Sequence, residues 1–289
     1  MTVARDRRRG EESRTLAIGP WSVRLDGLDA ALAAGLDTRW GPFVECSTSA
    51  EPSAAVELDA SDGNDLLPAP RPGERYRIDP VRGADRAIAS YGFTLAPVPG
   101  RARSWRLALG DSQAEPAERR IENGARFVVA TLALDAGGFA LHAAGVLVAG
   151  RGFLLAGPSR AGKSTAVRQS HPAASLGDDF GVLVPSGRDW HVVAVPFDNS
   201  ERIEADAVRG SFPLGRVLRV FQAERTRIDE LAPLRAATSL VGVAAFPWAV
   251  PGHAAALAER AHRLAAEGRF AHLHFARDAD LWSVLAALS

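Results

Sequence analysis

Hydrophobic and polar residues alternate in several short runs in the first part of the chain. Residues 21–25 and 104–109 alternate cleanly, 55–58 less regularly and 76–78 only briefly. A period of two is typical of a strand with one buried face. Residues 61–64 and 68–73 separate these runs and have the composition of loops. Residues 17–115 are therefore predicted to form a β-rich region, and no catalytic set of residues stands out in it.

A longer apolar period begins at Pro116 and predicts a helix over residues 116–136, which Gly137 and Gly138 would end. Its buried face would consist of Ile121, Ala125, Val128, Val129 and Leu132. An apolar run at 141–148, a turn at 149–152 and a second run at 153–156 predict an antiparallel hairpin. Further strands are expected at 182–184, 190–195, 212–221 and 270–275, and helices near 233–244, 253–267 and 278–288. This mixture indicates an α/β fold for residues 116–289.

The hairpin leads into a stretch with the pattern of a phosphate-binding loop. The stretch reads Gly157-Pro158-Ser159-Arg160-Ala161-Gly162-Lys163-Ser164-Thr165. Backbone N–H groups and a helix N-terminus hold phosphate charge, and the glycines allow close approach. Lys163 would reach the β- and γ-phosphates, while the hydroxyl of Ser164 would bind Mg²⁺. The alternative is a glycine-rich turn that matches by chance, and the strand in front of the loop favours the phosphate site.

Two neighbouring carboxylates, Asp178 and Asp179, follow Lys163 by 15 and 16 residues. This spacing leaves room for one short helix and a return to a neighbouring strand. One carboxylate would hold the metal ion, and the other would accept a proton from the attacking hydroxyl. A solvated turn is the alternative, because Gly-Asp-Asp is also typical of turns.

His142 lies at the start of the predicted hairpin. If the hairpin turns between Gly150 and Arg151, His142 falls opposite Ser159, within two residues, and so beside the phosphate loop. A charged imidazole would pair with a phosphoryl oxygen, and a neutral one would orient the nucleophile or help to bind metal. A purely structural histidine is the alternative.

Residues 141–183 resemble the catalytic domain of HPr kinase/phosphorylase. The likeness is carried by the run from Leu141 to Val146, the loop at 157–165 and the run from Leu176 to Asp179. Phosphoenolpyruvate carboxykinases share this core, a mixed sheet with flanking helices. The resemblance implies ATP and Mg²⁺ as cofactors, contact of His142 with the transferred phosphoryl group, and assembly into a homo-oligomer. It also implies that one of Asp178 and Asp179 is the base, for which we favour Asp179, with Asp178 as metal ligand. The residues themselves do not separate the roles of Asp178 and Asp179.

The chain departs from HPr kinases where they carry a second signature, an acidic residue followed by Ile-Arg-Gly-Leu-Gly. Residues 204–211 do not reproduce it, so HPr is not the expected substrate. The chain is more similar to stand-alone relatives in bacterial biosynthetic clusters, including those for lasso peptides, whose implied targets are hydroxyl groups. The polar loop at 196–212 is a candidate for the acceptor site. The arginines that would supply a charge to the phosphoryl group are Arg216, Arg219, Arg225 and Arg227.

Composition excludes several other partners. The 34 basic and 34 acidic residues give a net charge of zero, which favours neither nucleic acid nor an anionic membrane as a partner. Cys46 is the single cysteine, so no internal disulfide forms, and a reducing cytoplasm is expected. Residues 1–16 are polar and are predicted to be a disordered tail. No run of eighteen apolar residues is present, so no membrane span is expected.

These patterns together predict a kinase that transfers the γ-phosphoryl group of ATP to a hydroxyl of a peptide, a protein or a small molecule. Two alternatives stay open: a nucleotide-binding sensor or scaffold that transfers nothing, and an enzyme similar to phosphoenolpyruvate carboxykinase. The pair His272 and His274 resembles a metal site, but strand alternation explains it.

Overall fold

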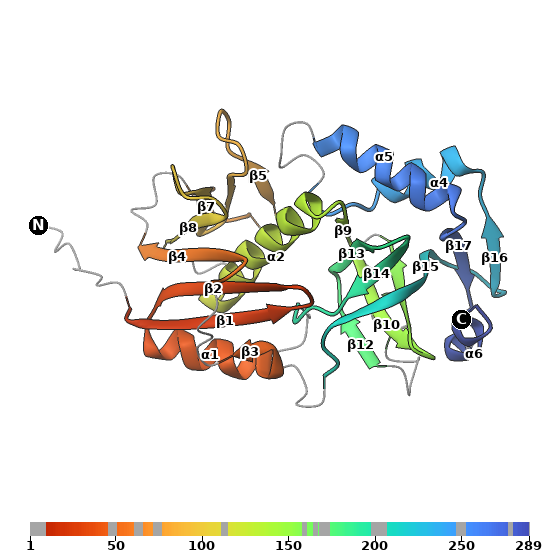
Figure 1. Ribbon diagram of the computed structural model, residues 1–289, viewed down its shortest axis with the longest axis horizontal. Coiled ribbons are helices and arrows are strands. Elements are labelled where there is room, and N and C mark those ends of the chain that lie inside the picture. Colours follow the sequence, from red (N-terminus) through yellow and green to blue (C-terminus); the bar gives the residue numbers. More distant parts are fainter. Residues whose placement is uncertain are drawn as a thin grey trace, which may run out of the picture. The chain divides into compact units, whose positions relative to one another are not determined.

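The computed structural model describes residues 10–45, 51–60, 66–71, 77–110, 115–157, 161–163, 167, 174–197, 207–246, 253–276 and 280–288. The chain forms two compact units (Figure 1). The first contains Met1–Ala17 and Trp21–Ala125, and the second contains Ile18–Pro20 and Arg126–Ser289. The division falls within one helix, so that this helix contributes to both units.

The N-terminal unit is built on an eight-stranded mixed sheet with the order β3-β1-β2-β4-β8-β7-β6-β5. Strands β2, β4 and β8 run parallel to one another, and the pairs β1–β3, β5–β6, β6–β7 and β7–β8 are antiparallel. The strands are β1 (Glu12–Ile18), β2 (Trp21–Leu28), β3 (Val44–Glu45), β4 (Ala54–Ala60), β5 (Ile78–Pro80), β6 (Ile88–Ser90), β7 (Phe93–Pro97) and β8 (Ser104–Leu109). The expected strands at 21–25, 55–58 and 104–109 are confirmed. Strand β5 begins at the end of the expected run 76–78, whose first residue lies outside the described residues.

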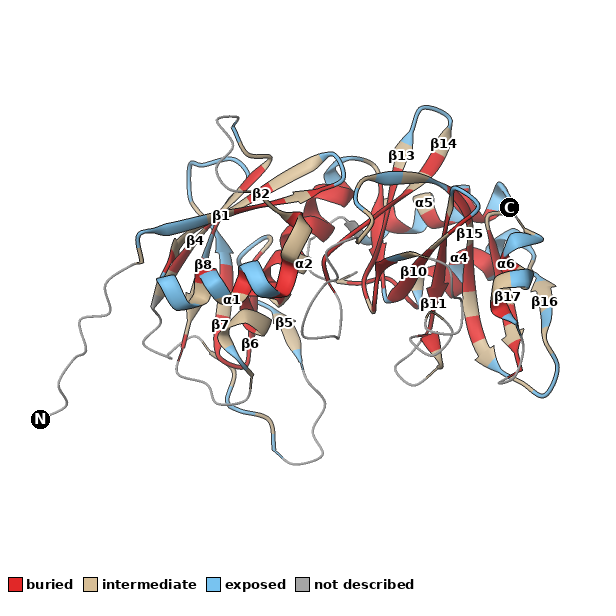
Figure 2. Ribbon diagram, turned by 90° about the horizontal axis from the view of Figure 1, so that it is seen from below, coloured by how far each residue is buried: buried red, intermediate tan, exposed pale blue. Residues whose placement is uncertain are grey.

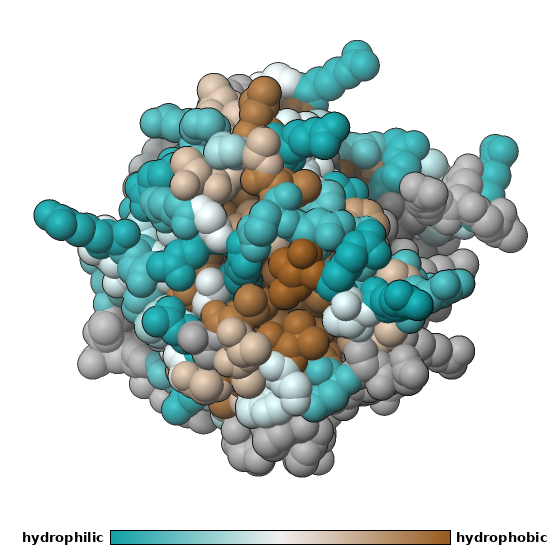
Figure 3. Space-filling model, turned by 90° about the vertical axis from the view of Figure 1, so that its right-hand side faces the viewer, coloured by the Kyte–Doolittle hydropathy of each residue, from teal (hydrophilic) through white to brown (hydrophobic). Residues whose placement is uncertain are grey.

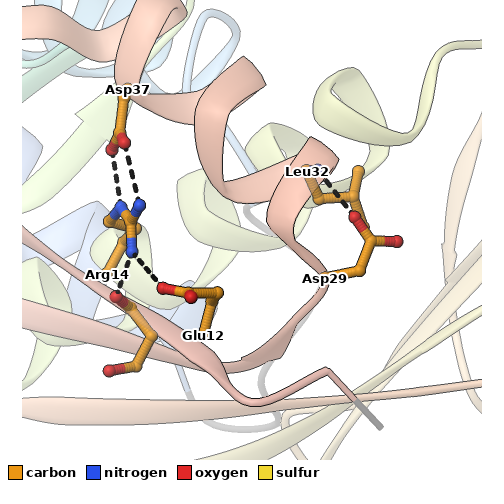
Figure 4. A network of polar contacts seen from close by, with 6 residues as sticks. Glu12, Arg14, Asp29, Leu32 and Asp37 are labelled. Carbon is orange, nitrogen blue, oxygen red and sulfur yellow. Dashed lines mark hydrogen bonds and ion pairs between the residues drawn. The ribbon is translucent and has the colours of Figure 1, made fainter. Parts of the chain in front are cut away.

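Two features of this unit differ from the sequence-based expectation. Strand β1 begins at Glu12, so residues 12–16 belong to the sheet rather than to a tail, and residues 1–9 lie outside the described residues. Helix α1 (Ala30–Trp40) was not expected and is followed by the short 3₁₀ helix η1 (Gly41–Phe43). The Asp29 side chain caps α1 by accepting the N–H of Leu32, and Arg14 of β1 pairs with Asp37 at 2.7 Å (Figure 4). Tertiary contacts of this kind stabilise a helix whose Ala-rich sequence shows no clear period.

Helix α2 (Ala117–Asp135) confirms the helix expected over 116–136. The expected face, which includes Ile121, Val128 and Leu132, is buried. Gly137 follows with a φ of 84°, a conformation that favours glycine and ends the helix. The first half of α2 is fixed by the buried ion pair between Arg39 and Glu122, whose atoms are 2.6 Å apart.

The C-terminal unit contains a nine-stranded mixed sheet with the path β12-β10-β11-β15-β14-β13-β9, and β17 and β16 continue from β15. Strand β15 pairs antiparallel with β14 over its first residues, then runs parallel to both β11 and β17. The strands are β9 (Phe139–Leu141), β10 (Ala143–Val148), β11 (Arg151–Ala156), β12 (Ala174–Gly177), β13 (Gly181–Ser186), β14 (Asp189–Val193), β15 (Ser211–Gln222), β16 (Arg227–Glu230) and β17 (Phe270–Phe275). The expected strands of this region are confirmed, while β9 and β16 were missed.

Helices flank this sheet, as Figure 1 shows, and they are α4 (Pro233–Val241), α5 (His253–Ala266) and α6 (Leu281–Ala286). All three lie where the sequence predicts helices. The central strands are buried over most of their length (Figure 2). One apolar cluster joins β10, β11, β15 and β17 to α6, and includes Phe153, Leu218 and Leu273. Apolar surface remains visible on the side shown in Figure 3, and Leu234 of α4 is 74% exposed.

The coarse expectation of a mixed α/β fold is therefore confirmed. The register of the β10–β11 hairpin differs from the expected one, because its turn is formed by Ala149 and Gly150, with φ angles of 49° and 77°. Val148 faces Arg151, and Ala143 faces Ala156. His142 consequently lies opposite Gly157 instead of Ser159, within the expected two residues.

Candidate functional site

The candidate site lies where β11 ends. In sheets of this kind, ligands bind outside the carboxyl ends of parallel strands, and β11 is parallel to β15. Gly157 and Gly162 have φ angles of 155° and 97°, a region that side chains rarely adopt. A Cβ on Gly157 would also approach the Cβ of Ala161 to 3.2 Å. Glycine is therefore required at both positions by the path of the chain.

Lys163 is buried, with 5% of its surface exposed. Nζ donates a hydrogen bond to the carbonyl oxygen of Gly157 at 2.9 Å and lies 3.4 Å from Oδ1 of Asp179. The lysine side chain thus lies next to the first residue of its own loop and contacts a carboxylate from the turn after β12. Pro158, Ser159, Arg160, Ser164 and Thr165, which were expected to complete the phosphate and metal sites, lie outside the described residues.

Asp178 and Asp179 follow directly after β12. This strand pairs antiparallel with β10, so β10 separates it from β11. The backbone N–H of Asp178 donates to the carbonyl oxygen of Phe197 at 3.0 Å, and Asp178 is buried. Asp179 adopts a φ of 66°, and its side chain is 39% exposed. A non-glycine residue in this region is uncommon and is frequently found at functional sites.

His142 lies in the bend between β9 and β10. Its backbone N–H donates to Val243 at 2.8 Å, and its carbonyl oxygen accepts from Gly157 at 3.3 Å. The residue is exposed, yet the protein around its ring lowers its pKa, first by desolvation and further through the charges of Lys163 and Arg126. The carboxylate of Asp179 and a hydrogen bond with its backbone act in the opposite direction. The imidazole therefore lies close to Asp179 and favours its neutral form.

The structure thus brings together His142, Gly157, Lys163 and Asp179, and the buried Asp178 directly precedes Asp179. We call these five residues the loop cluster. Its accessible groups are an imidazole and a carboxylate, and its ammonium group is buried beneath them. Such an arrangement is able to hold an anionic ligand and to accept a proton from a neighbouring hydroxyl.

Three of the four arginines that the sequence nominated are bonded to other side chains. Arg216 pairs with Glu230, Arg227 bonds Asp229 at 3.2 Å, and Arg225 is exposed. Arg219 donates to Ser239 Oγ at 2.8 Å, and its neighbour in the sheet is His272. Residues 198–206 of the expected acceptor loop lie outside the described residues.

The sequence did not single out Arg126 of α2. In the structure, its charge lowers the pKa of His142. The only signal in the sequence was a single arginine within an otherwise apolar stretch of helix.

His272 and His274 form hydrogen-bonded contacts rather than a metal site. His272 Nε2 lies 3.1 Å from Ser239 Oγ, and His274 Nε2 lies 3.0 Å from Asp229. Within the described ranges, no group of three or more His, Cys, Asp or Glu side chains is arranged to hold a metal ion. Likewise, none of the helices described is long and apolar enough to cross a membrane.

Comparison with known proteins adds one weak likeness. No family model matches the chain, and no curated protein matches it. Among solved structures, the HPr(Ser) kinase/phosphatase from Coxiella burnetii is similar with a TM-score of 0.28 and 11% sequence identity. The match covers 52% of this chain and 92% of that one. A TM-score of this size does not establish a shared fold.

Proposed function

We propose that the protein is a phosphotransferase that moves the γ-phosphoryl group of ATP to a hydroxyl of a peptide, a protein or a small molecule. The observation that carries this proposal is the position of Lys163, whose Nζ lies between the Gly157 carbonyl and the Asp179 carboxylate. A phosphate-loop lysine and a carboxylate at one point are the two charges that phosphoryl transfer to a hydroxyl requires.

The amino-acid composition supports a special role for this lysine. Lys163 is the only lysine of the chain, whose other 33 basic residues are all arginines. A lysine offers a compact point charge, whereas arginine offers a wide planar fork. A chain that uses arginine everywhere else and lysine at this one position favours a site where only the compact ammonium fits.

The donor set also fits Mg²⁺. Carboxylate and hydroxyl oxygens are ligands that magnesium prefers, and one or two carboxylates with phosphate oxygens suffice. Asp178 and Ser164 would hold the ion, which when bound neutralises charge on the β- and γ-phosphates.

The remaining roles follow from exposure. Asp179 is the more exposed of the two acids, and its unusual backbone conformation turns it toward Lys163, so we assign it as the base. In the reaction, the acceptor oxygen forms a bond to the γ-phosphorus, and the bond from that phosphorus to the β-phosphate oxygen breaks. The hydroxyl proton passes to Asp179, and ADP leaves. Positioning and charge neutralisation supply most of the catalysis.

The test has two parts, and the single lysine makes the first unambiguous. An acyl-phosphate derivative of ATP should acylate Lys163, in competition with ATP but not with AMP, as mapped by mass spectrometry. The second part is incubation with γ-labelled ATP, Mg²⁺ and candidate peptide or small-molecule acceptors. Labelled product that requires Lys163 would support the proposal. Protection of Lys163 without any labelled product would instead favour a nucleotide-binding sensor.

A further inference from the structure

Arg126 occupies a defined position in the C-terminal unit. Its guanidinium carbon lies 5.7 Å from the centroid of the Phe197 ring, over the ring face. Phe197 is fully buried, and its carbonyl oxygen accepts the backbone N–H of Asp178. The arginine is thus packed on the residue whose backbone fixes one of the two site carboxylates. A cation over an aromatic face is attracted by the ring and restricted in its orientation.

A chain of aromatic rings holds this arrangement in place. The ring centroid of Phe127, the residue after Arg126, lies 5.5 Å from that of Phe246. The centroid of Phe246 lies 6.5 Å from that of Phe180. The ring centroids of Phe180 and Phe197 are 5.5 Å apart. The series of rings therefore starts at Phe127 of α2 and ends at Phe197, on which Arg126 of α2 packs. Phe180 also directly follows Asp179, so α2 and the acidic turn are locked in one packed assembly.

The charge of Arg126 reaches the loop cluster. It lowers the pKa of His142, as the charge of Lys163 does, and the packing on Phe197 places the guanidinium next to the residue that holds the backbone of Asp178. Lys163 itself is bound to Gly157 and paired with Asp179. A transferring phosphoryl group spreads negative charge over three oxygens, and a preorganised second cation stabilises that charge strongly.

We propose that Arg126 is a second phosphate-binding cation of the site and that it contacts the γ-phosphoryl group. This inference rests on the proposed function, and it identifies a helix residue outside the phosphate loop as part of the binding site. Arginine suits the role because its planar fork donates two parallel hydrogen bonds to phosphate oxygens. The packing on Phe197 keeps that fork oriented before the nucleotide arrives.

The test compares two nucleotides that differ only in the group Arg126 would contact. Binding of Mg·ADP and of a non-hydrolysable Mg·ATP analogue is measured by calorimetry for wild type, Arg126→Gln, Arg126→Lys and the control Arg227→Gln. We expect Arg126→Gln to weaken the triphosphate analogue by about 10- to 100-fold, as for a lost charged hydrogen bond. ADP affinity should change by less than about threefold, Arg126→Lys should be intermediate, and the control should match wild type.

The outcomes separate this inference from the proposed function. An equal loss for both nucleotides, or no loss, would overturn the role of Arg126. If the ratio of the two affinities depends on Arg126 while the wild type transfers no phosphoryl group, the inference stands and the kinase proposal fails. If the wild type transfers the phosphoryl group and Arg126→Gln transfers it equally well, the kinase proposal stands and the role of Arg126 fails. Should Arg126→Gln lose its native circular dichroism, the affinity ratio of the conservative Arg126→Lys decides.

Discussion

Two polar clusters on the same sheet contain the same kinds of side chain and differ in how they are built. The loop cluster contains His142, Lys163 and the two aspartates. The second, which we call the strand cluster, consists of Arg219, Phe221, Asp229, His272 and His274. Each has histidine, a permanent cation and a carboxylate, so residue type alone does not distinguish them.

The strand cluster is assembled from residues inside regular strands. Arg219 faces His272, Phe221 faces His274, and Asp229 faces His272 in the register of β15, β16 and β17. The rings of Phe221 and His274 stack, with their centroids 5.3 Å apart and an interplanar angle of 19°. The guanidinium carbon of Arg219 lies 5.4 Å from the Phe221 ring centroid. Its polar groups bond to one another, to Arg227 of β16 or to Ser239 of α4. Most of these partners lie in the same or a neighbouring strand.

The loop cluster is assembled from residues at strand ends and bends. Gly157 and Asp179 have positive φ angles, and each lies within two residues of the end of a strand. Their groups meet only because four segments converge there. Groups held in unusual conformations at strand ends are directed at a shared space, whereas groups within strands are directed at one another. Under the proposed function, the first cluster carries the chemistry and the second contributes to stability.

The largest contrast is expected at Lys163. Lys163→Ala should lower turnover by about 10²- to 10³-fold or more, because a preorganised charge on the phosphates is removed. Arg227→Gln, beside the strand cluster, should retain wild-type turnover. Both are measured by initial rates of labelled phosphoryl transfer at saturating acceptor. Undiminished turnover in Lys163→Ala would remove the distinction between the two clusters.

The next largest effect concerns the division of labour between the acids. Asp179→Asn should leave binding of the ATP analogue within about threefold and lower transfer by about 10²-fold or more, as for a lost general base. Asp178→Asn should instead raise the Mg²⁺ concentration that half-saturates the reaction. Magnesium titrations of both variants provide the measurement. If Asp179→Asn alters only the magnesium requirement, the two roles are exchanged.

A smaller effect is expected at His142. His142→Gln removes the imidazole but keeps both backbone hydrogen bonds to Val243 and Gly157, so the hairpin should remain intact. We expect transfer to fall by about tenfold, in line with one charged or strongly polar hydrogen bond to the phosphoryl group. Single-turnover rates and thermal melting of the same preparation separate catalysis from folding. A lower melting temperature with an unchanged transfer rate would show that His142 serves the fold and not the reaction.

The smallest effect is expected in the strand cluster. Burial, together with the charges of Arg219 and His274, lowers the pKa of His272. The unfolded chain therefore binds this proton more readily, and the stability contribution is complete above about pH 6.5 and is lost as the pH falls below it. We expect the wild-type melting temperature to fall between about pH 7.5 and about pH 5.5, and to fall less in His272→Asn.

Turnover of His272→Asn at neutral pH should change by less than about twofold, as for a substitution away from the site. If the melting temperatures of wild type and His272→Asn fall equally as the pH is lowered, protonation of His272 does not affect the stability of the fold. A large loss of turnover would instead connect the strand cluster to the reaction.

Local patterns account for most of the fold. Alternation predicted β2, β4 and β8, and the helical period predicted α2, because each signal lies within one element. Strand β16 was missed because only four residues, three of them charged, form it. Helix α1 was missed because its stability comes from the Asp29 cap and from contacts with Arg14 and Glu122, which no local period records.

The phosphate-loop pattern, the acidic pair and the histidine were recognisable in the sequence, because glycine spacing, charge and turn chemistry are properties of neighbouring residues. Their meeting at one point depends on tertiary structure, since the distance between Lys163 and Asp179 is set by the order of β12, β10 and β11. The position of Arg126 beside Phe197 is decided by the same packing, which joins residues about seventy positions apart. The sequence alone thus determined which chemical groups are available, and the packing of helix on sheet decided which of them share a site, because side chains act over a few ångströms and only the folded chain sets those distances.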